Sequence, residues 1–295
     1  MTSRTSVKRR RAPQSYRLRR TLGDWATRAV LTAVGAAVLF PFVYAFFASF
    51  KPLPEILSSG ARLLPQEWTL DNYFRAWEQA GFAQYFQNSL IVVLGVTVFD
   101  VVIASLLGYL LGRNLMPFGR TIQGVMAATL FVGLGTATLY PRFVIASALG
   151  IDNLVGVILV EVSGLTVIHV FLTRAFVSTL PMELEEAARV DGNGLIGTYR
   201  HIVFPLLRPI LFTVAILAFE SAWNNFQIPY VFTLASPELR TLVVGVFALR
   251  STEDGSQAYD LMLAGAMLII IPVTIVFLLF QKHFIAGMTE GSVKG

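Results

Sequence analysis

The chain contains no cysteine, which excludes a disulfide framework and any metal site built on thiolates. Its three histidines, His169, His201 and His283, are too widely spaced for a zinc-binding motif. The phosphate-binding pattern G-x-x-x-x-G-K-[ST], the nucleophile elbow G-x-S-x-G and the zinc helix H-E-x-x-H are also missing. We therefore expect no enzyme activity, no metal and no cofactor in this chain.

Charged residues are scarce as well. They make up 14% of the chain, against about 25% in an ordinary soluble domain, while 55% of the residues are hydrophobic. A soluble fold has no way to shield that much apolar surface from water, so lipid is the natural solvent for this chain. The net charge of +5 does not indicate nucleic acid, because the basic residues gather in one N-terminal segment and in short loops.

A basic N-terminal arm, residues 1–28, leads into the first apolar run. Residues 1–20 alone hold eight Lys and Arg side chains. The run that follows, 29–50, is too long for the apolar region of a secretory signal peptide, and no clear small-residue cleavage site closes it. We interpret it as a retained membrane-spanning helix, with an arm that is disordered and attracted to anionic lipid headgroups.

Six stretches are apolar enough and long enough to cross a bilayer, which takes about 20 helical residues. They lie at residues 29–50, 88–112, 121–140, 154–173, 209–230 and 261–281. Helices are required because lipid offers no hydrogen-bond partner to free backbone groups, and Pro41 and Pro272 are tolerated as kinks inside such spans. The predicted fold class is an all-α membrane protein with about six transmembrane helices.

The positive-inside rule places both termini of this bundle in the cytoplasm. The cytoplasmic segments are then 1–28, 113–120, 174–208 and 282–295. They carry nine, two, four and two Lys and Arg residues, which is 17 of the 23 in the chain. An odd number of spans would put the C-terminal tail outside and weaken the fit. We expect a multi-pass protein whose residues 29–281 form the membrane domain.

Two outer segments, 51–87 and 231–260, are long and polar. The first contains a Thr-Leu-Asp-Asn helix-start signal, which predicts a short amphipathic helix near residues 70–80. The second is rich in turn-forming residues. The two segments form either a docking platform for an external protein or a pair of ordinary solvated loops.

The polar segment 178–209 is predicted to begin with a short helix at the cytoplasmic mouth of the bundle. Pro181 suits the first turn of a helix, where its missing N–H costs little. Acidic residues that complement the helix dipole follow it, namely Glu183, Glu185 and Glu186. Ala187 and Ala188 are small, so another surface can approach the backbone closely.

A turn and a second short helix complete this segment. Gly192 and Gly194 allow the chain to turn after the first helix. The second helix, about 195–204, leads to Pro205 and the next span. The residues alone leave two interpretations open, an interfacial amphipathic elbow without a partner or a helix that docks onto another protein.

The same segment carries a recognisable pattern. Its string Glu186-Ala187-Ala188-x-x-Asp191-Gly192, continuing to Ile202-x-x-Pro205, resembles the EAA motif of ABC importer permeases. Leu195 and Asn193 depart from the pattern of the sugar branch, but they leave the carboxylate, the small residues and the turn in place. Three further strings are similar to carbohydrate permeases: Glu67–Tyr73 with Asn88-Ser89-Leu90, Trp223-Asn224-Asn225-Phe226, and the C-terminal 281–295.

The resemblance covers residues 42–295 and is closest to the MalG-like transmembrane subunits of the carbohydrate-uptake family. It implies a MalG-like permease fold in the cell membrane of a prokaryote, and transport of a sugar. Its implied partners are a second homologous permease, two copies of a cytoplasmic ATPase that binds the ATP and Mg²⁺, and an extracytoplasmic sugar-binding protein.

The resemblance also assigns roles to residues. The cytoplasmic loop is expected to fit a groove on the ATPase and to transmit its closure to the membrane helices, through Glu185, Glu186, Ala187, Ala188, Asp191, Gly192 and Pro205. The C-terminal tail, 282–295, is expected to reach the interface of the two ATPase subunits, through Gly287, Thr289, Gly291 and Lys294. Simple disorder of this tail is the alternative.

Polar residues inside the predicted spans are candidates for a substrate path. Helical periodicity places Glu220, Asn224 and Gln227 on one face, where they could bond sugar hydroxyls. Trp223 or Phe226 could stack on a sugar ring. The other interpretation is hydrogen bonding between helices.

Two further carboxylates, Asp100 and Glu161, also lie within predicted spans. Asp100 either faces the bundle, is protonated or pairs with another subunit, and the sequence does not choose. These carboxylates leave room for a rival function, an ion-gradient-driven secondary carrier, although no internal repeat is visible.

Overall fold

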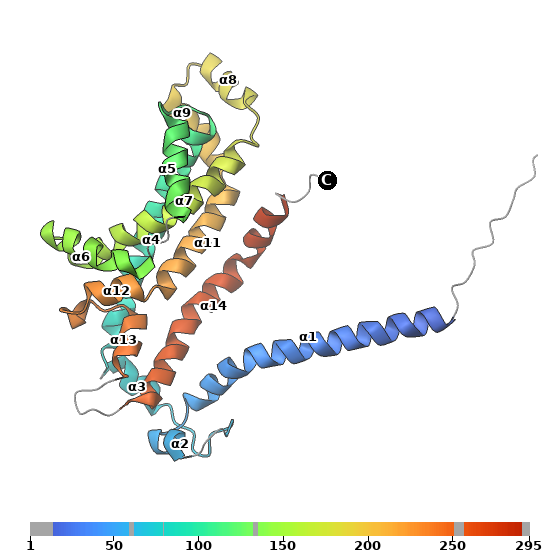
Figure 1. Ribbon diagram of the computed structural model, residues 1–295, viewed down its shortest axis with the longest axis vertical. Coiled ribbons are helices and arrows are strands. Elements are labelled where there is room, and N and C mark those ends of the chain that lie inside the picture. Colours follow the sequence, from blue (N-terminus) through green and yellow to red (C-terminus); the bar gives the residue numbers. More distant parts are fainter. Residues whose placement is uncertain (1–13, 59–61, 79, 132–134, 251–256, 291–295) are drawn as a thin grey trace, which may run out of the picture.

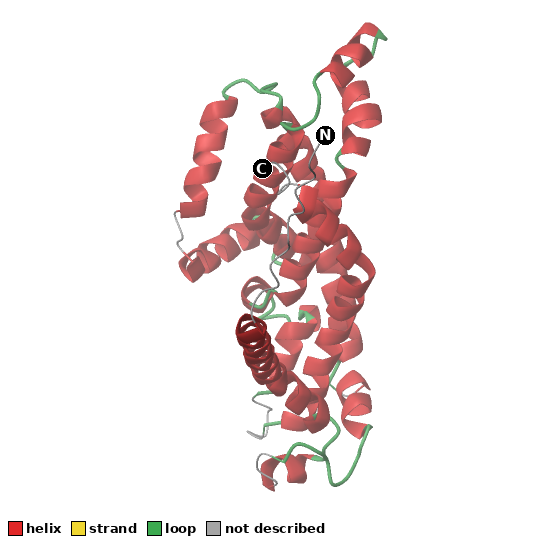
Figure 2. Cartoon of the chain, turned by 90° about the vertical axis from the view of Figure 1, so that its right-hand side faces the viewer, coloured by secondary structure: helices red, strands yellow, loops and turns green. Residues whose placement is uncertain are grey.

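The computed structural model describes residues 14–58, 62–78, 80–131, 135–250 and 257–290 (Figure 1). Within these ranges every regular element is a helix and no strand is present (Figure 2). This confirms the all-α fold class. The elements are α1 (Gln14–Ala48), α2 (Leu53–Ser58), α3 (Asp71–Glu78), α4 (Phe82–Gly112), α5 (Gly119–Phe131), η1 (Gly135–Thr138), α6 (Leu139–Ala148), α7 (Leu154–Val177), α8 (Glu183–Val190), α9 (Leu195–Thr198), η2 (Tyr199–Val203), α10 (Phe204–Leu206), α11 (Arg208–Asn224), α12 (Gln227–Phe232), η3 (Pro237–Leu239), α13 (Leu242–Ala248) and α14 (Tyr259–Glu290).

Three helices are long and apolar enough to cross a membrane without a break, over Thr27–Ala48 in α1, Phe82–Gly112 in α4 and Tyr259–Leu279 in α14. Three more spans are bent pairs of helical segments. These are Gly119–Phe131 with Thr136–Ala148, Leu154–Gly164 with Thr166–Val177, and Leu195–Leu206 with Arg208–Asn224. Counting each pair as one span gives six among the described residues, which agrees with the number that hydropathy predicts.

The third predicted span, 121–140, is not a continuous helix. α5 ends at Phe131, and the segment Thr136–Ala148 runs at 110° to it. The second segment starts with the 3₁₀ turn η1, at Gly135, and not with an α-helix. Its tighter hydrogen bonds do not continue an α-helical ladder, and its glycine disfavours a helix interior. The prediction of an unbroken helix over these residues was wrong.

The fifth predicted span, 209–230, also ends early, because α11 stops at Asn224. Pro229 explains the break. A proline has no N–H to donate and its ring clashes with the carbonyl four residues earlier, which here belongs to Asn225. Asn225 accordingly adopts an extended conformation, with φ −68° and ψ 122°, and its side-chain oxygen accepts a hydrogen bond from the N–H of Ile228.

The core of the bundle is the pair α4 and α7, which run in the same direction. A Cβ added at Gly95 would meet Ile158, one at Gly108 would meet Thr173, and one at Gly112 would meet Val177. Residue numbers therefore increase in the same direction along both helices, so the helices are parallel. Glycine lets the two backbones approach closely, as small residues do between membrane helices. α11 packs against both α4 and α7, and these contacts connect the centre of the bundle.

Replacing Gly108 with valine is expected to destabilise the folded chain by about 1–3 kcal/mol, the usual cost of overpacking. The new Cβ would lie 2.6 Å from the Cβ of Thr173 and 3.1 Å from the backbone nitrogen of Arg174, which cannot rotate away. Thermal unfolding in detergent measures the effect. Gly124→Val in α5 is the matched control, since nothing lies within 4 Å of its added Cβ. Equal losses for the two variants would contradict this packing.

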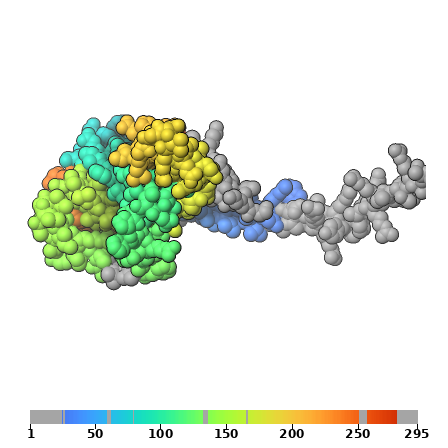
Figure 3. All heavy atoms as spheres, turned by 90° about the horizontal axis from the view of Figure 1, so that it is seen from above, coloured from blue at the N-terminus to red at the C-terminus, as the bar shows by residue number. Residues whose placement is uncertain are grey.

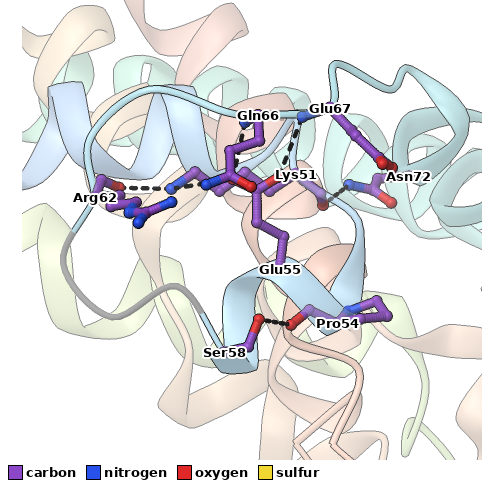
Figure 4. A network of polar contacts seen from close by, with 8 residues as sticks. All are labelled: Lys51, Pro54, Glu55, Ser58, Arg62, Gln66, Glu67 and Asn72. Carbon is purple, nitrogen blue, oxygen red and sulfur yellow. Dashed lines mark hydrogen bonds and ion pairs between the residues drawn. The ribbon is translucent and has the colours of Figure 1, made fainter.

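The first segment predicted to lie outside the membrane, 51–87, is fixed by hydrogen bonds among its described residues. Its predicted amphipathic helix is α3. The buried Lys51 donates to the carbonyl of Arg62 over 2.5 Å, and the Glu55 carboxylate accepts hydrogen bonds from the backbone N–H groups of Gln66 and Glu67 (Figure 4). The side-chain amide of Asn72, in α3, donates to the carbonyl of Lys51 and so connects α3 to the residues that follow α1.

α1 leaves the bundle and projects away from the other helices (Figure 1). An 18-residue apolar window within Thr27–Ala48 has no buried residue, although Ala48 at the end of α1 is buried and α1 contacts α14. An apolar helix exposed on every side requires lipid or another chain around it. Residues 1–13 of the basic arm lie outside the described residues. From Gln14 onward the arm is helical and continues α1, so the expectation of disorder fails for that part.

Candidate functional site

The predicted cytoplasmic helix is α8, and it lies at one end of the molecule, with α2 and α3 at the other (Figure 1). Gly192 ends it at φ +85°, a conformation that glycine adopts at little cost. The N–H of Gly192 donates to the carbonyl of Arg189, and the N–H of Asn193 donates to that of Ala188. This pair of bonds is a Schellman motif, so the predicted turn is present as a defined helix end.

The side chains of α8 divide into an outer and an inner face. Glu186 and Ala187 are exposed, as are Asp191 and Gly192 of the following turn. Glu185 and Ala188 are each only 2% exposed and point into the chain's own bundle. We predicted both as ATPase-coupling residues. Helical periodicity turns positions 185 and 188 to the same, inner face, so their side chains point away from the exposed surface, and a coupling role for them stays a prediction.

Large apolar side chains are exposed around the outer face of α8. Val190 is 88% exposed and Ile196 is 80% exposed, and Leu184 and Leu195 are also exposed. Figure 3 looks onto this end of the molecule, where the α8 region (yellow) lies uncovered on the surface. Exposed apolar side chains gathered beside acidic ones are characteristic of a protein-binding surface.

Glu185 is held by two residues at the end of α4. One carboxylate oxygen accepts a hydrogen bond from Nε of Arg113 over 2.6 Å, and the other accepts one from the hydroxyl of Tyr109 over 3.0 Å. The Arg113 Nη2 also donates to the carbonyl of Leu180, just before α8. Sequence reasoning missed this cluster. Glu185 lies more than 70 positions from both Tyr109 and Arg113 in the sequence. The basic residue at the end of the second span was the one sequence feature that could have indicated the cluster.

The segment after α8 leads through a π-helical turn, η2, into the fifth span. The Tyr199 hydroxyl lies 2.8 Å from the Ser105 hydroxyl of α4, and the Tyr199 ring packs against that of Tyr109. Pro205 follows in α10, close to the 75° bend between Leu195–Leu206 and α11. The predicted helix–turn–helix is therefore present, and it joins α11 at a sharp angle.

A buried polar cluster joins α4 to α7 inside the membrane segment. Asp100 is fully buried, accepts a hydrogen bond from the Thr166 hydroxyl over 2.7 Å and pairs with Nδ1 of His169. Of the alternatives for Asp100, facing its own bundle is the one that the structure supports. Sequence reasoning overlooked His169 because it searched only for metal-binding spacing. Among the residues that the structure describes, no group of three or more metal-binding side chains was found.

Glu161 is buried in α7 as well, and neither carboxylate oxygen has a hydrogen-bond partner within the described part of the chain. The parallel register of α4 and α7 places it at the level of Thr97, whose hydroxyl is also buried without a partner there. Together with Nε of Arg174 in α7, these two groups hold the buried polar atoms of α4 and α7 that have no hydrogen-bond partner among the described residues.

The predicted substrate-path face is only partly assembled. Glu220 and Asn224 are exposed on α11, and the Asn224 side chain donates to the Glu220 carboxylate over 2.9 Å. Gln227 lies beyond the end of α11, at the start of α12, so the periodicity of one helix no longer places it on their face. Its part in a substrate path stays a prediction.

The two aromatic candidates for the substrate path, Trp223 and Phe226, pack against other aromatic side chains of this chain. Trp223 is buried, donates its indole N–H to the carbonyl of Ile269 and stacks against Phe219. Phe226 stacks on Tyr230 with 5.0 Å between the ring centroids. Trp223 is therefore a core residue in this structure and does not present its ring to a path.

Part of the predicted tail is helical. α14 continues to Glu290, so Gly287 and Thr289 belong to a helix, whereas Gly291 and Lys294 lie outside the described residues. The C-terminal part of α14 runs toward the end of the molecule that carries α8 (Figure 1).

Known proteins resemble this chain over nearly its whole length. The "Arabinooligosaccharides transport system permease protein AraQ" of Halalkalibacterium halodurans is 32% identical over 275 residues, which are 92% of this chain and 97% of that protein. The "Maltodextrin transport system permease protein MdxG" of Bacillus subtilis is 29% identical over 94% of this chain and 98% of its own length.

A solved structure shares the fold. It is a bacterial ABC transporter involved in the import of the acidic polysaccharide alginate, and it matches with a TM-score of 0.79 at 22% identity, over 93% of this chain and 99% of its own. The family model of the "Binding-protein-dependent transport system inner membrane component" matches residues 24–290. The chain belongs to this family of membrane transport subunits, the inner membrane components of binding-protein-dependent transport systems.

Proposed function

We propose that this chain is one of two permease subunits of an ATP-driven importer for sugars in a prokaryotic cell membrane. The similar permeases are named for arabinooligosaccharides and maltodextrin, so a sugar or oligosaccharide is the favoured substrate class. The observation that carries the mechanism is α8, whose outer face combines carboxylates with exposed apolar side chains at one end of the bundle.

The end that carries α8 is the cytoplasmic one in this proposal. The segments assigned to that side, 1–28, 113–120, 174–208 and 282–295, carry 17 of the 23 Lys and Arg residues. Both termini then lie in the cytoplasm. α2, α3 and the segment 231–250 face outward, where an extracytoplasmic sugar-binding protein docks.

A pair of cytoplasmic ATPase subunits binds the ATP and Mg²⁺ and supplies the energy. The outer face of α8 contacts one of them through Glu186, Ala187, Val190 and Asp191. Closure of the ATPases displaces α8, and the 75° bend near Pro205 transfers the displacement to α11. The bundle thereby alternates between inward-facing and outward-facing states. Docking of the binding protein favours the outward state, which is coupling between two sites.

The second permease subunit covers the exposed apolar surface of α1 and completes the path for the sugar. The tail, with Gly287, Thr289, Gly291 and Lys294, extends from α14 toward the ATPase pair. The run of α14 toward the α8 end supports this placement.

Asn224 is proposed to contact the sugar, together with Glu220. Asn224→Ala is expected to raise the sugar concentration for half-maximal uptake about two- to tenfold, because one hydrogen bond is worth about 0.5–1.5 kcal/mol. Uptake kinetics across a sugar panel measure this, and Glu220→Gln, which keeps an acceptor for Asn224, is the milder comparison. Unaltered kinetics for every sugar would reduce the pair to a contact within α11.

The function is tested in proteoliposomes that contain both permeases and the ATPase. Uptake of a labelled sugar is expected to require internal ATP and the external binding protein. Uptake driven by a proton or sodium gradient without ATP would favour the secondary carrier instead. Thermal stabilisation of the binding protein across the same sugar panel identifies the substrate.

A further inference from the structure

We propose that Glu185 and Arg113 form the link that carries the displacement of α8 into α4. The inference depends on the proposed function of α8 as the helix that meets the ATPase. Glu185 acts as a positioning residue, because its carboxylate faces its own bundle and has no access to a partner protein.

The link is rigid at both of its ends. Both oxygens of the Glu185 carboxylate are used, one by Arg113 and the other by Tyr109. Arg113 is the residue that caps the C-terminus of α4, where a cation is favoured by the helix dipole. Its guanidinium also donates a hydrogen bond to the carbonyl of Leu180 over 3.0 Å. Arg113 therefore binds both α8 and the residues that precede it.

The backbone connections of α8 are less suited to transmit force. The preceding residues 178–182 are mostly exposed and the following turn is exposed, with Gly192 and Gly194 in it. Charge-assisted hydrogen bonds between buried groups are short and strongly oriented. A push on α8 therefore reaches α4 more directly through Glu185 than through either loop.

A displacement of α4 is transmitted to the other central helices, α7 and α11. α4 packs along α7 in a parallel, glycine-mediated contact, and it packs against α11. The hydroxyl contact of Tyr199 with Ser105 attaches the segment after α8 to the same helix. Stability alone is a poor reason for a buried ion pair, since well-packed apolar residues often serve as well or better. Positioning of α8 on α4 accounts for the pair.

The test uses the reconstituted complex of both permeases and the ATPase, with the binding protein. Variants Arg113→Gln, Glu185→Gln and their combination are compared with Arg120→Gln, which removes an exposed cation from the neighbouring α5. Four quantities are measured: thermal unfolding, co-purification of the ATPase, ATP hydrolysis, and sugar molecules imported per ATP. Tyr109→Phe, which deletes one hydroxyl, is a milder variant for the case that the others unfold.

Each single variant is expected to retain the ATPase and to hydrolyse ATP while importing about tenfold less sugar per ATP, an effect in the range seen for single residues on a coupling network. The double variant loses no more than the worse single one, because both substitutions break one link. Tyr109→Phe loses less, and Arg120→Gln loses nothing.

Unchanged sugar import per ATP in both single variants would overturn the link. An equal loss in Arg120→Gln, or a loss of ATPase co-purification in Arg113→Gln, would also overturn it, because the first indicates a general charge effect and the second a docking role. If the wild-type chain itself does not retain the ATPase, the proposed function fails, and that result is distinct from all of these.

Discussion

Replacing His169 with leucine is expected to destabilise the folded chain by about 3–5 kcal/mol, the cost of removing one partner from a buried pair. Asp100 would remain fully buried in the middle of α4 with only the Thr166 hydroxyl as a donor. That donor is shared, because Thr166 also bonds to the carbonyl of Val162. The loss is measured by thermal unfolding of the purified permease complex in detergent.

A second substitution at the same place is expected to reverse most of this loss. Asp100→Ala combined with His169→Leu removes both polar groups and approximately keeps their combined volume, and such apolar replacements of buried pairs are often neutral. His201→Leu is the matched control, because His201 is exposed and bonds only to a backbone carbonyl. A His169→Leu protein as stable as the His201→Leu protein would show that the pair does not hold α4 to α7.

Replacing Gly192 with proline is expected to lower ATP-driven sugar transport by an order of magnitude or more, while the chain still inserts into the membrane. Proline fixes φ near −65° and removes the N–H, at a cost of about 3 kcal/mol or more where neither is compatible with the native structure. Gly192 needs φ +85°, and its N–H closes α8 onto the carbonyl of Arg189.

The effect is measured as uptake in proteoliposomes, with the amount of inserted chain determined by immunoblot. Gly194→Ala serves as the control two residues away. Gly194 has φ −74°, and its added Cβ meets nothing within 4 Å. Wild-type uptake by the Gly192→Pro protein would mean that the shape of this turn has no part in transport.

Features that depend on nearby residues were predictable from the sequence. The second span was expected at residues 88–112 and is part of α4, and the outer amphipathic helix expected near residues 70–80 is α3. Long apolar runs, helix-start residues and a turn glycine such as Gly192 act through local backbone chemistry. A single sequence therefore contains enough information to place them.

Pairings across the bundle were not predictable in this way. Asp100 and His169 are 69 positions apart, and Arg113 and Glu185 are 72 apart. Hydropathy shows that such groups need partners in a membrane, but it does not show which side chains meet. The inward direction of Glu185 was not predictable for the same reason, since the inner and outer faces of a short polar helix differ only in tertiary contacts.

One misjudged feature did have a local signal. Pro229 lies inside the predicted fifth span, and the clash of its ring with the carbonyl of Asn225 was sufficient reason to end the helix there. The membrane context weakened this inference, because prolines are tolerated in spans such as α1 and α14, which contain Pro41 and Pro272. Gln227 was consequently assigned to the same helix as Glu220 and Asn224, whereas it begins α12.

The central claim, that the outer face of α8 meets the ATPase, is tested most directly by cross-linking. The chain has no cysteine, so Val190→Cys and Leu57→Cys each carry a unique reactive site, and both positions are highly exposed apolar residues at opposite ends of the molecule. In the assembled complex Val190→Cys is predicted to cross-link to the ATPase subunit and Leu57→Cys is not. An ATPase adduct at residue 57, or none at residue 190, would contradict the account.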